Sequence, residues 1–346
     1  MKKILALTLC MLMVLALFSG CAAKKEEAPA AEPAAPAEPA VEEKVEETKV
    51  EFPTKNITLI IPQNAGGDTD VVGRQLASMM EAKLGVSIVC QNLPGGNTSI
   101  GLQAMLDAEP DGYTVALSAT NIALIKATGY GDMDYSYFKS LGGINYDTCL
   151  VFSRGNEDRW SNVAELVEWA KANPGALTIG TGTAGGVWHL GTVDFMNSTG
   201  IDAVIIPSTG GVGGVATTLL NGDIDIAIIS IGAFASYVAN GDMVALAAMS
   251  EERLPFYPET PTMLELGYDL TCLSCRGLIT SPEVPEEVCK ILEDTLAECV
   301  NSPEFDEFLN NMYSVKMAMS GADYYEFMKS ENEVYPELVK TAGLGA

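Results

Sequence analysis

The chain contains one histidine, His189, among its 346 residues, and basic residues are scarce. Twenty lysines and arginines stand against 46 aspartates and glutamates, which gives a formal net charge of −26. Nucleic-acid binding is not expected, because neutralising phosphates requires clustered Lys and Arg side chains. The negative charge does not exclude an anionic ligand, because a bound anion responds to nearby hydrogen-bond donors more than to distant, screened charges.

Motifs of catalysis and metal binding are also lacking. A nucleophilic site would need a placed serine or cysteine beside the histidine, and no Gly-x-Ser-x-Gly elbow occurs. Cys272 and Cys275 form a single C-x-x-C, which is a poor zinc motif without a second pair. We therefore expect no enzymatic activity, no cofactor and no metal. We expect His189 to hydrogen-bond loop backbone at the start of a helix.

Long apolar runs are confined to the N-terminus, where two lysines precede residues 4–18. That run is too short for a standard membrane span, so residues 1–20 are predicted to be a signal peptide. Residues 17–21 resemble a bacterial lipobox, which predicts lipidation of Cys21; an ordinary signal peptide is the alternative. Residues 21–55 are rich in Ala, Pro and Glu and predict a disordered tether from the extracytoplasmic face of the cell membrane.

Two interpretations are compatible with the remaining six cysteines. An exported protein can form disulfides, but spacing does not determine which cysteines pair. We expect small buried residues or one disulfide, rather than redox chemistry, at the following positions: Cys90, Cys149, Cys272, Cys275, Cys289 and Cys299.

Residues 57–84 form the stretch around which the folded part is organised. A β-branched run over 57–61 predicts a strand, and apolar residues at helical spacing predict a helix that ends at Leu84. Between them, Gly66-Gly67 lets backbone N–H groups approach a ligand, and Asp68 or Thr69 is expected to cap the helix. A helix start suits a carboxylate or phosphate. The signal is weak by itself, because many such turns use glycine only for geometry.

Strands and helices continue to alternate along the chain, which predicts an α/β fold with mainly parallel sheets. The body is long enough for two lobes. Strands are expected at 57–61, 86–90, 113–118, 149–153, 177–180, 203–207, 222–230 and 243–249. Helices are expected from about 68 to 84 and at 100–107, 163–172, 187–196, through 219–220, and at 285–300, 303–312 and 322–346. The segment 149–153 is expected to cross between lobes, and 243–249 to return to the first.

A series of short motifs occurs in a fixed order over some two hundred residues: Ile57-Thr-Leu-Ile-Ile-Pro62, Ala65-Gly-Gly-x-Thr69-Asp70, Pro94-Gly-Gly96, Pro110-Asp-Gly-Tyr-Thr114, Asn173-Pro-Gly175, Gly180-Thr-Gly182, Gly222-Asp-Ile-Asp225 and Pro258-Glu-Thr-Pro-Thr262. The set resembles the extracytoplasmic receptors of tripartite tricarboxylate transporters, the Bug family. The resemblance implies a two-lobed, type II periplasmic-binding-protein fold, with two mixed, mainly parallel sheets joined by hinge strands. We expect residues 56–147 plus 245–346 to form lobe 1 and residues 148–244 to form lobe 2.

The resemblance also implies a ligand cleft between the lobes, lined by loops at strand ends. Strand-end loops are where α/β sheets usually bind ligands. Backbone amides, hydroxyls and bridging waters would hold a carboxylate there. The expected ligand-binding residues are Gln63, Asn64, Ala65, Gly66, Gly67, Thr69, Asp70, Ser118, Thr120, Thr181, Gly182, Thr183, His189, Ser208, Thr209, Gly210, Gly211 and Ser230.

Some positions depart from the family pattern. An aromatic residue is usual at Gln63, a small residue at Asp68, and an acid near Ser230. If Asp68 faces the cleft, it favours a ligand with a donor or a cation, such as an amino acid. If it caps the helix, which we expect, it carries no information about the ligand. Trp188 is expected to line either the pocket or the lobe interface.

Three functions are compatible with these features. The first is a lipid-anchored, monomeric receptor that binds a small organic acid and delivers it to the membrane permease of a tripartite transporter. The second is a sensory lipoprotein with the same pocket that signals to a receptor kinase. The third, a hydrolase, is disfavoured by the missing catalytic motifs.

Overall fold

The computed structural model describes residues 51–208, 211–232 and 234–344. The predicted signal peptide, the lipidation of Cys21 and nearly all of the tether lie outside the described residues. Thr209 and Gly210 of the predicted site also lie outside them.

The strands of the described residues form one mixed sheet with the order β2-β1-β3-β9-β4-β7-β5-β6, and β8 and β10 also pair with β4. The strands are β1 (Ile57–Ile61), β2 (Ile88–Asn92), β3 (Thr114–Ala119), β4 (Lys139–Arg154), β5 (Leu177–Thr181), β6 (Ala203–Pro207), β7 (Ile226–Ser230), β8 (Met243–Ala248), β9 (Leu273–Thr280) and β10 (Val315–Lys316). The β1–β2, β1–β3, β5–β6 and β5–β7 pairs are parallel, whereas β4 and β9 pair antiparallel with their neighbours.

Helices follow most of these strands, as the alternation in the sequence predicts. They are α1 (Asp68–Leu84), α2 (Ser99–Leu106), α3 (Ile122–Ile125), α4 (Val163–Ala172), α5 (Val187–Thr199), α6 (Gly211–Asn221), α7 (Ala235–Ala239), α8 (Glu286–Val300), α9 (Pro303–Asn311) and α10 (Gly321–Thr341). The short helices α3 and α7 were not predicted, because each is only about one turn long.

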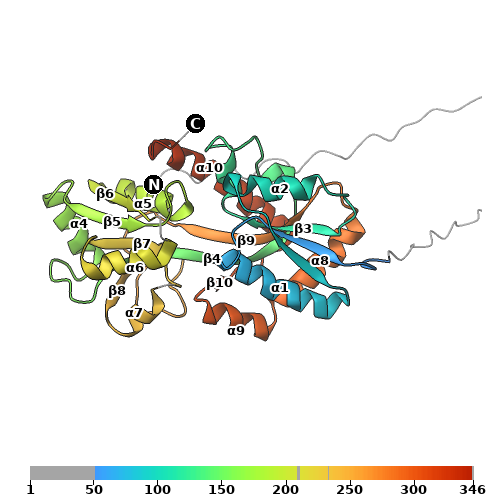
Figure 1. Ribbon diagram of the computed structural model, residues 1–346. Coiled ribbons are helices and arrows are strands. Elements are labelled where there is room, and N and C mark those ends of the chain that lie inside the picture. Colours follow the sequence, from blue (N-terminus) through green and yellow to red (C-terminus); the bar gives the residue numbers. More distant parts are fainter. Residues whose placement is uncertain (1–50, 209–210, 233, 345–346) are drawn as a thin grey trace, which may run out of the picture. The chain divides into compact units, whose positions relative to one another are not determined.

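Strand β4 connects two groups of elements, which we call the first and second lobes. It pairs with β9 as far as Thr148 and with β7 from Cys149 onward. Figure 1 shows β4 and β9 running between the group with α1, α2 and α8 and the group with α4, α5 and α6. Nearly all of β4 is buried, because both faces of the strand are covered. The predicted crossing strand at 149–153 is therefore the second half of a longer one.

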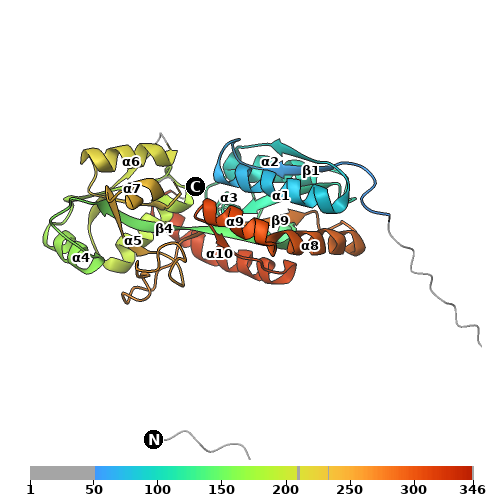
Figure 2. The same cartoon turned by 90° about the horizontal axis from the view of Figure 1, so that it is seen from below.

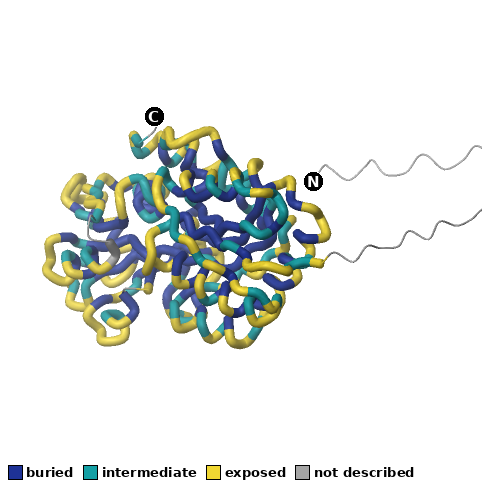
Figure 3. Tube along the Cα trace, turned by 45° about the vertical axis from the view of Figure 1, so that its right-hand side comes forward, coloured by how far each residue is buried: buried dark blue, intermediate teal, exposed yellow. Residues whose placement is uncertain are grey.

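Each lobe has its own hydrophobic core. In the first lobe, Leu59 and Leu76 pack in a cluster with Leu292 and Phe305, in which α1 contacts β1 and α8 contacts α1 and β4. In the second lobe, Phe195 packs in a cluster that includes residues of β5, β7, α4 and α5. Figure 2 shows α1, α2 and α8 in one group and α4, α5, α6 and α7 in the other. Figure 3 shows the buried residues gathered in the interior and the exposed ones on the outer turns of the chain.

Two predicted placements differ from the structure. Residues 243–249 were expected to return to the first lobe, but β8 pairs with Leu150–Arg154 of β4, beside the second-lobe core. The return is made by β9, which was not predicted because Arg276 and Gly277 interrupt its apolar run.

Helix α10 was expected on the outside of the first lobe only. Its Tyr324 and Met328 pack in a cluster with Phe138 of the first lobe, whereas Tyr335 and Val339 pack in the second-lobe core. A helix of 21 residues extends about 30 Å, enough to contact a hydrophobic cluster in each lobe. Helix α10 is therefore a third element that crosses between the lobes, with β4 and β9.

The six cysteines of the described part are free thiols, and all but Cys90 are buried. The prediction of small buried residues is confirmed there. Burial raises the pKa of the Cys275 thiol well above its usual value, which keeps it protonated and unreactive.

Candidate functional site

Two loops, one in each lobe, have the same backbone geometry. The β1–α1 loop contains Gly66-Gly67 and the β5–α5 loop contains Gly185-Gly186. The first glycine of each pair has a positive φ, 81° and 76°, and the second has φ −81° with ψ 167° or 168°. Glycine is required at the first position because side chains disfavour that conformation. We call these two segments the twin loops.

The amide of the first glycine in each twin loop is held by a side chain four residues later. Gly66 N donates to Asp70 Oδ2 at 2.8 Å, and Gly185 N donates to His189 Nδ1 at 3.0 Å. The neutral histidine ring must therefore carry its proton on Nε2. Burial lowers the pKa of His189, which keeps the ring neutral. The expectation of a histidine that hydrogen-bonds loop backbone is confirmed.

Asp70 is occupied by the protein itself. It accepts from Arg74 Nε at 3.0 Å and from Asn92 Nδ2 at 2.9 Å, and Asn92 also donates to Gln63 O at 3.0 Å. The hydrogen bonds that Asp70 accepts from Arg74, Gly66 and Asn92 lower its pKa to about 2. Asp70 therefore holds the backbone of the first twin loop in place.

The tips of the twin loops are exposed, and their helix starts carry free amides. Asn64–Asp68 and Thr183–Ala184 are exposed. The first helical hydrogen bonds begin at Val71 and Leu190, so the three amides that precede each have no partner within the helix. No side chain in the described part of the chain caps α1 or α5. Two uncapped helix starts are sites at which an anion is stabilised.

The expectation that Asp68 or Thr69 caps α1 is wrong. Gly67 occupies the N-cap position, and Asp68 is the first helical residue. Thr69 Oγ1 instead accepts from Arg276 Nε of β9 at 3.0 Å. The alternative that Asp68 faces a ligand is therefore open again.

A buried ion pair on the crossing strands was missed from the sequence. Arg276 Nη2 of β9 lies 2.6 Å from Asp147 Oδ2 of β4, and the two residues are only 4% and 8% exposed. The available signal was a single charged residue inside each apolar run, without any indication that the two meet. The pair lies beneath the start of α1, because Arg276 also contacts Thr69.

Asp68 lies within the electrostatic reach of this pair. Its side chain is exposed, yet surrounding protein and the charge of Asp147 raise the pKa of Asp68, opposed by Arg276. An exposed carboxylate responds in this way when protein surrounds it without covering it.

Three of the predicted hydroxyls are engaged between structural elements. Ser118 Oγ is 2.9 Å from Tyr324 Oη, Thr120 Oγ1 accepts from Cys275 N at 3.0 Å, and Thr181 Oγ1 donates to Ile228 O at 3.0 Å. All three residues are buried. They fix the strand ends that carry the exposed loops.

The remaining predicted residues lie at the ends of strands in the second lobe. Ser208 N donates to Thr181 O and Gly182 O, at 3.0 and 3.1 Å, and α6 begins at Gly211. Ser230 is buried at the end of β7, opposite Cys149 of β4. Trp188 packs between the two clusters of the second lobe and against Gly182.

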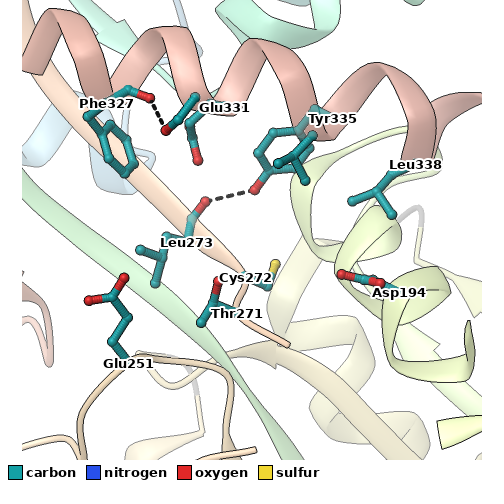
Figure 4. Close-up of a pocket in the computed structure, with 12 residues that line it drawn as sticks. Asp194, Glu251, Thr271, Cys272, Leu273, Phe327, Glu331, Tyr335 and Leu338 are labelled. Carbon is teal, nitrogen blue, oxygen red and sulfur yellow. Dashed lines mark hydrogen bonds between the residues drawn. The ribbon is translucent and has the colours of Figure 1, made fainter. Parts of the chain in front are cut away.

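A cavity of about 230 Å³ lies elsewhere, between α5, α10 and residues 271–273. Figure 4 shows Glu331 and Tyr335 of α10 above Leu273, whose carbonyl accepts from Tyr335 Oη at 3.0 Å. Burial raises the pKa of Glu331 to about 8, although a hydrogen bond with Thr120 opposes this. None of the cavity's lining residues belongs to the predicted binding set.

The described residues show neither a metal-binding cluster nor a membrane-spanning helix. In that part of the chain, no three or more His, Cys, Asp or Glu side chains gather in a way that would hold a metal ion. None of its helices combines the length and apolar character needed to cross a membrane.

Comparison with known proteins gives a family match. The model of the tripartite tricarboxylate transporter family receptor matches residues 72–344. A UPF0065 protein of Bordetella pertussis is 27% identical over 296 residues, which cover 85% of this chain and 91% of that protein.

Solved structures agree with this match. A TctC solute-binding protein from Polaromonas superposes with a TM-score of 0.76 at 28% identity, covering 84% of this chain and 99% of that one. The R. palustris protein Rpa4515, solved with adipate, superposes with a TM-score of 0.71 at 25% identity, covering 85% and 99%. The two-lobed periplasmic-binding-protein fold expected from the sequence is confirmed.

Proposed function

The chain belongs to the tripartite tricarboxylate transporter family of receptors, and from this membership we propose that it captures a small organic carboxylate outside the cytoplasm and delivers it to a membrane transporter. The adipate bound to the similar Rpa4515 protein supports a carboxylate as ligand. Membership of a receptor family also argues against an enzyme.

The twin loops are the observation that carries this proposal. Each lobe contributes one exposed glycine turn with an uncapped helix behind it. An anion between the lobes would be met by backbone amides from both sides without a lysine or arginine. The residues proposed to contact it are those of the two exposed tips, Asn64–Asp68 and Thr183–Ala184, with the free amides at the starts of α1 and α5 and the start of α6.

Closure of the lobes is the proposed mechanism. A ligand that contacts both twin loops binds the closed form better than the open one, and so shifts the population toward it. The crossing elements β4, β9 and α10 would accommodate the movement. The closed form is the one that a permease would recognise.

The N-terminus completes the proposal. We propose that residues 1–20 are removed as a signal peptide, and that a lipid on Cys21 and the tether to residue 55 hold a monomeric receptor at the membrane. The proposed lobe boundary at 147/148 lies next to the point at which β4 changes partners.

Thermal unfolding with a panel of mono-, di- and tricarboxylates and amino acids tests the function. A cognate ligand at about a hundred times its dissociation constant stabilises the protein by roughly 2.7 kcal/mol. An absence of stabilisation by every compound would contradict the proposal. Thr183→Phe should abolish the stabilisation, whereas the equally exposed Thr217→Phe on α6 serves as the matched control.

A further inference from the structure

The twin loops have the same geometry but different charges. The first carries Asp68 at the start of α1, and the second carries the uncharged Val187 at the equivalent position. The side chain that holds each loop also differs in charge. Asp70 binds the amide of Gly66 in the first loop, and the neutral His189 binds the amide of Gly185 in the second. A ligand between the loops therefore meets two unlike ends.

Most charges around the first loop are already neutralised. Arg74 pairs with Asp70 at 2.9 Å, and Arg276 pairs with Asp147 at 2.6 Å. Asp68 makes no hydrogen bond or ion pair with the described residues. Among the described residues, Asp68 is therefore the acid of this cluster that is left without a partner. The three carboxylates and two guanidinium groups of the cluster sum to −1 when all are ionised.

The position of Asp68 is set by its neighbours rather than by a cap of its own. Arg276 Nε donates to Thr69 Oγ1 at 3.0 Å, which holds the first turn of α1 on β9, a strand that crosses between the lobes. The preceding residue, Asp68, is exposed at this junction. An unpaired, exposed carboxylate beside the proposed ligand repels a second carboxylate and attracts a cation.

Resting on the proposed function, we propose that the ligand of this receptor is a carboxylate that carries a protonated amine, as an amino acid does. Asp68 accepts a charge-assisted hydrogen bond from the ammonium group. The amides at the start of α5, where no acid stands, receive the carboxylate. A dicarboxylate without an amine would place a negative group beside Asp68.

Matched pairs of compounds test this inference by calorimetry on the full chain. The pairs are alanine and propionate, aspartate and succinate, and glutamate and glutarate, which differ only in the amine. We expect the amine-bearing member of at least one pair to bind about tenfold or more tightly than its partner. Equal or weaker binding by the amine-bearing members would overturn the inference and leave the proposed function intact. No binding by either member of any pair would count against both.

Asp68→Asn tests the residue itself. The variant keeps the shape of the side chain and removes its charge, so we expect the preference for the amine to fall about tenfold while the amine-free partner binds as well or better. The control is Glu287→Gln, which removes an exposed acid from the first turn of α8. An unchanged preference in Asp68→Asn would overturn the role of Asp68. The melting temperatures of the ligand-free variants establish that both are folded.

Discussion

Two acids in the described part of the protein, Asp147 and Glu331, avoid an unpaired charge in the interior in different ways. Asp147 is paired with Arg276, whereas Glu331 has its pKa raised to about 8 by burial. A buried charge without a partner is costly, so both arrangements follow from the same physical requirement. Neither could be predicted from the sequence, because the partners come from distant segments.

Removing one member of the buried pair should be strongly destabilising. We expect Asp147→Asn to lower the free energy of unfolding by about 3 kcal/mol, because Arg276 then remains buried without a counter-charge. Urea unfolding measures the change. Glu298→Gln is the control, since its pair with Lys83 is exposed and should contribute less than about 1 kcal/mol. Equal losses in the two variants would contradict this account.

The raised pKa of Glu331 predicts an unusual dependence of the protein's stability on pH. Its folded pKa of about 8 lies above the ordinary value of 4.5, so only the unfolded chain releases this proton between these values. The contribution to stability is complete below about pH 4.5 and is lost as the pH rises to about 8. We expect Glu331→Gln to stabilise the protein by about 2 kcal/mol at pH 8 and little at pH 5.

Thermal unfolding at several pH values measures this effect. Glu333→Gln is the matched control, because it lies on the same helix and is exposed. An effect of Glu331→Gln that does not change between pH 5 and pH 8 would show that the carboxyl group is ionised throughout.

At the scale of single elements, the twin loops were only half predictable. The glycine pairs and the helices after them can be recognised in the sequence, because glycine and helical periodicity act locally. The cap was predicted wrongly, because Asp68 and Thr69 suit that position but Thr69 is bonded to β9 instead. A contact between distant segments overrode a local preference.

The conformation of the twin loops predicts equal effects in the two lobes. Gly66→Ala and Gly185→Ala should each destabilise the protein by about 1 kcal/mol, because φ is positive at both and nothing lies within 4 Å of an added Cβ. Gly213→Ala in α6 is the control: it also has open space, but has no positive φ and should stabilise by about 0.5 kcal/mol or more. Chemical denaturation measures the free energy of unfolding of the three variants. A gain in stability for Gly185→Ala would contradict the expected backbone strain.

At the scale of the whole molecule, three crossing elements connect the lobes. Strands β4 and β9 pair with each other across the first lobe, and α10 contributes side chains to a hydrophobic cluster in each lobe. Movement of one lobe relative to the other therefore involves α10 as well as the strands. Helix α10 also contacts α5, which carries the second twin loop.

Closure predicts simultaneous protection of both twin loops. In hydrogen exchange, a ligand found in the panel should slow the amides of residues 64–70 and 183–189 together, because each lobe contributes one side of the site. The amides of α8, on the far side of the first lobe, should not change. Protection of only one loop would contradict binding between the lobes.

The sequence by itself determined the alternation of strands and helices, the position of the glycine turns and the family, because these depend on local spacing and on residues that stand in order along the chain. The tertiary structure alone decided which strands cross between the lobes, that α10 belongs to both, and that Arg276 meets Asp147 and Thr69. Such contacts join segments far apart in the sequence, and they depend on burial and charge pairing in three dimensions, which no local pattern encodes.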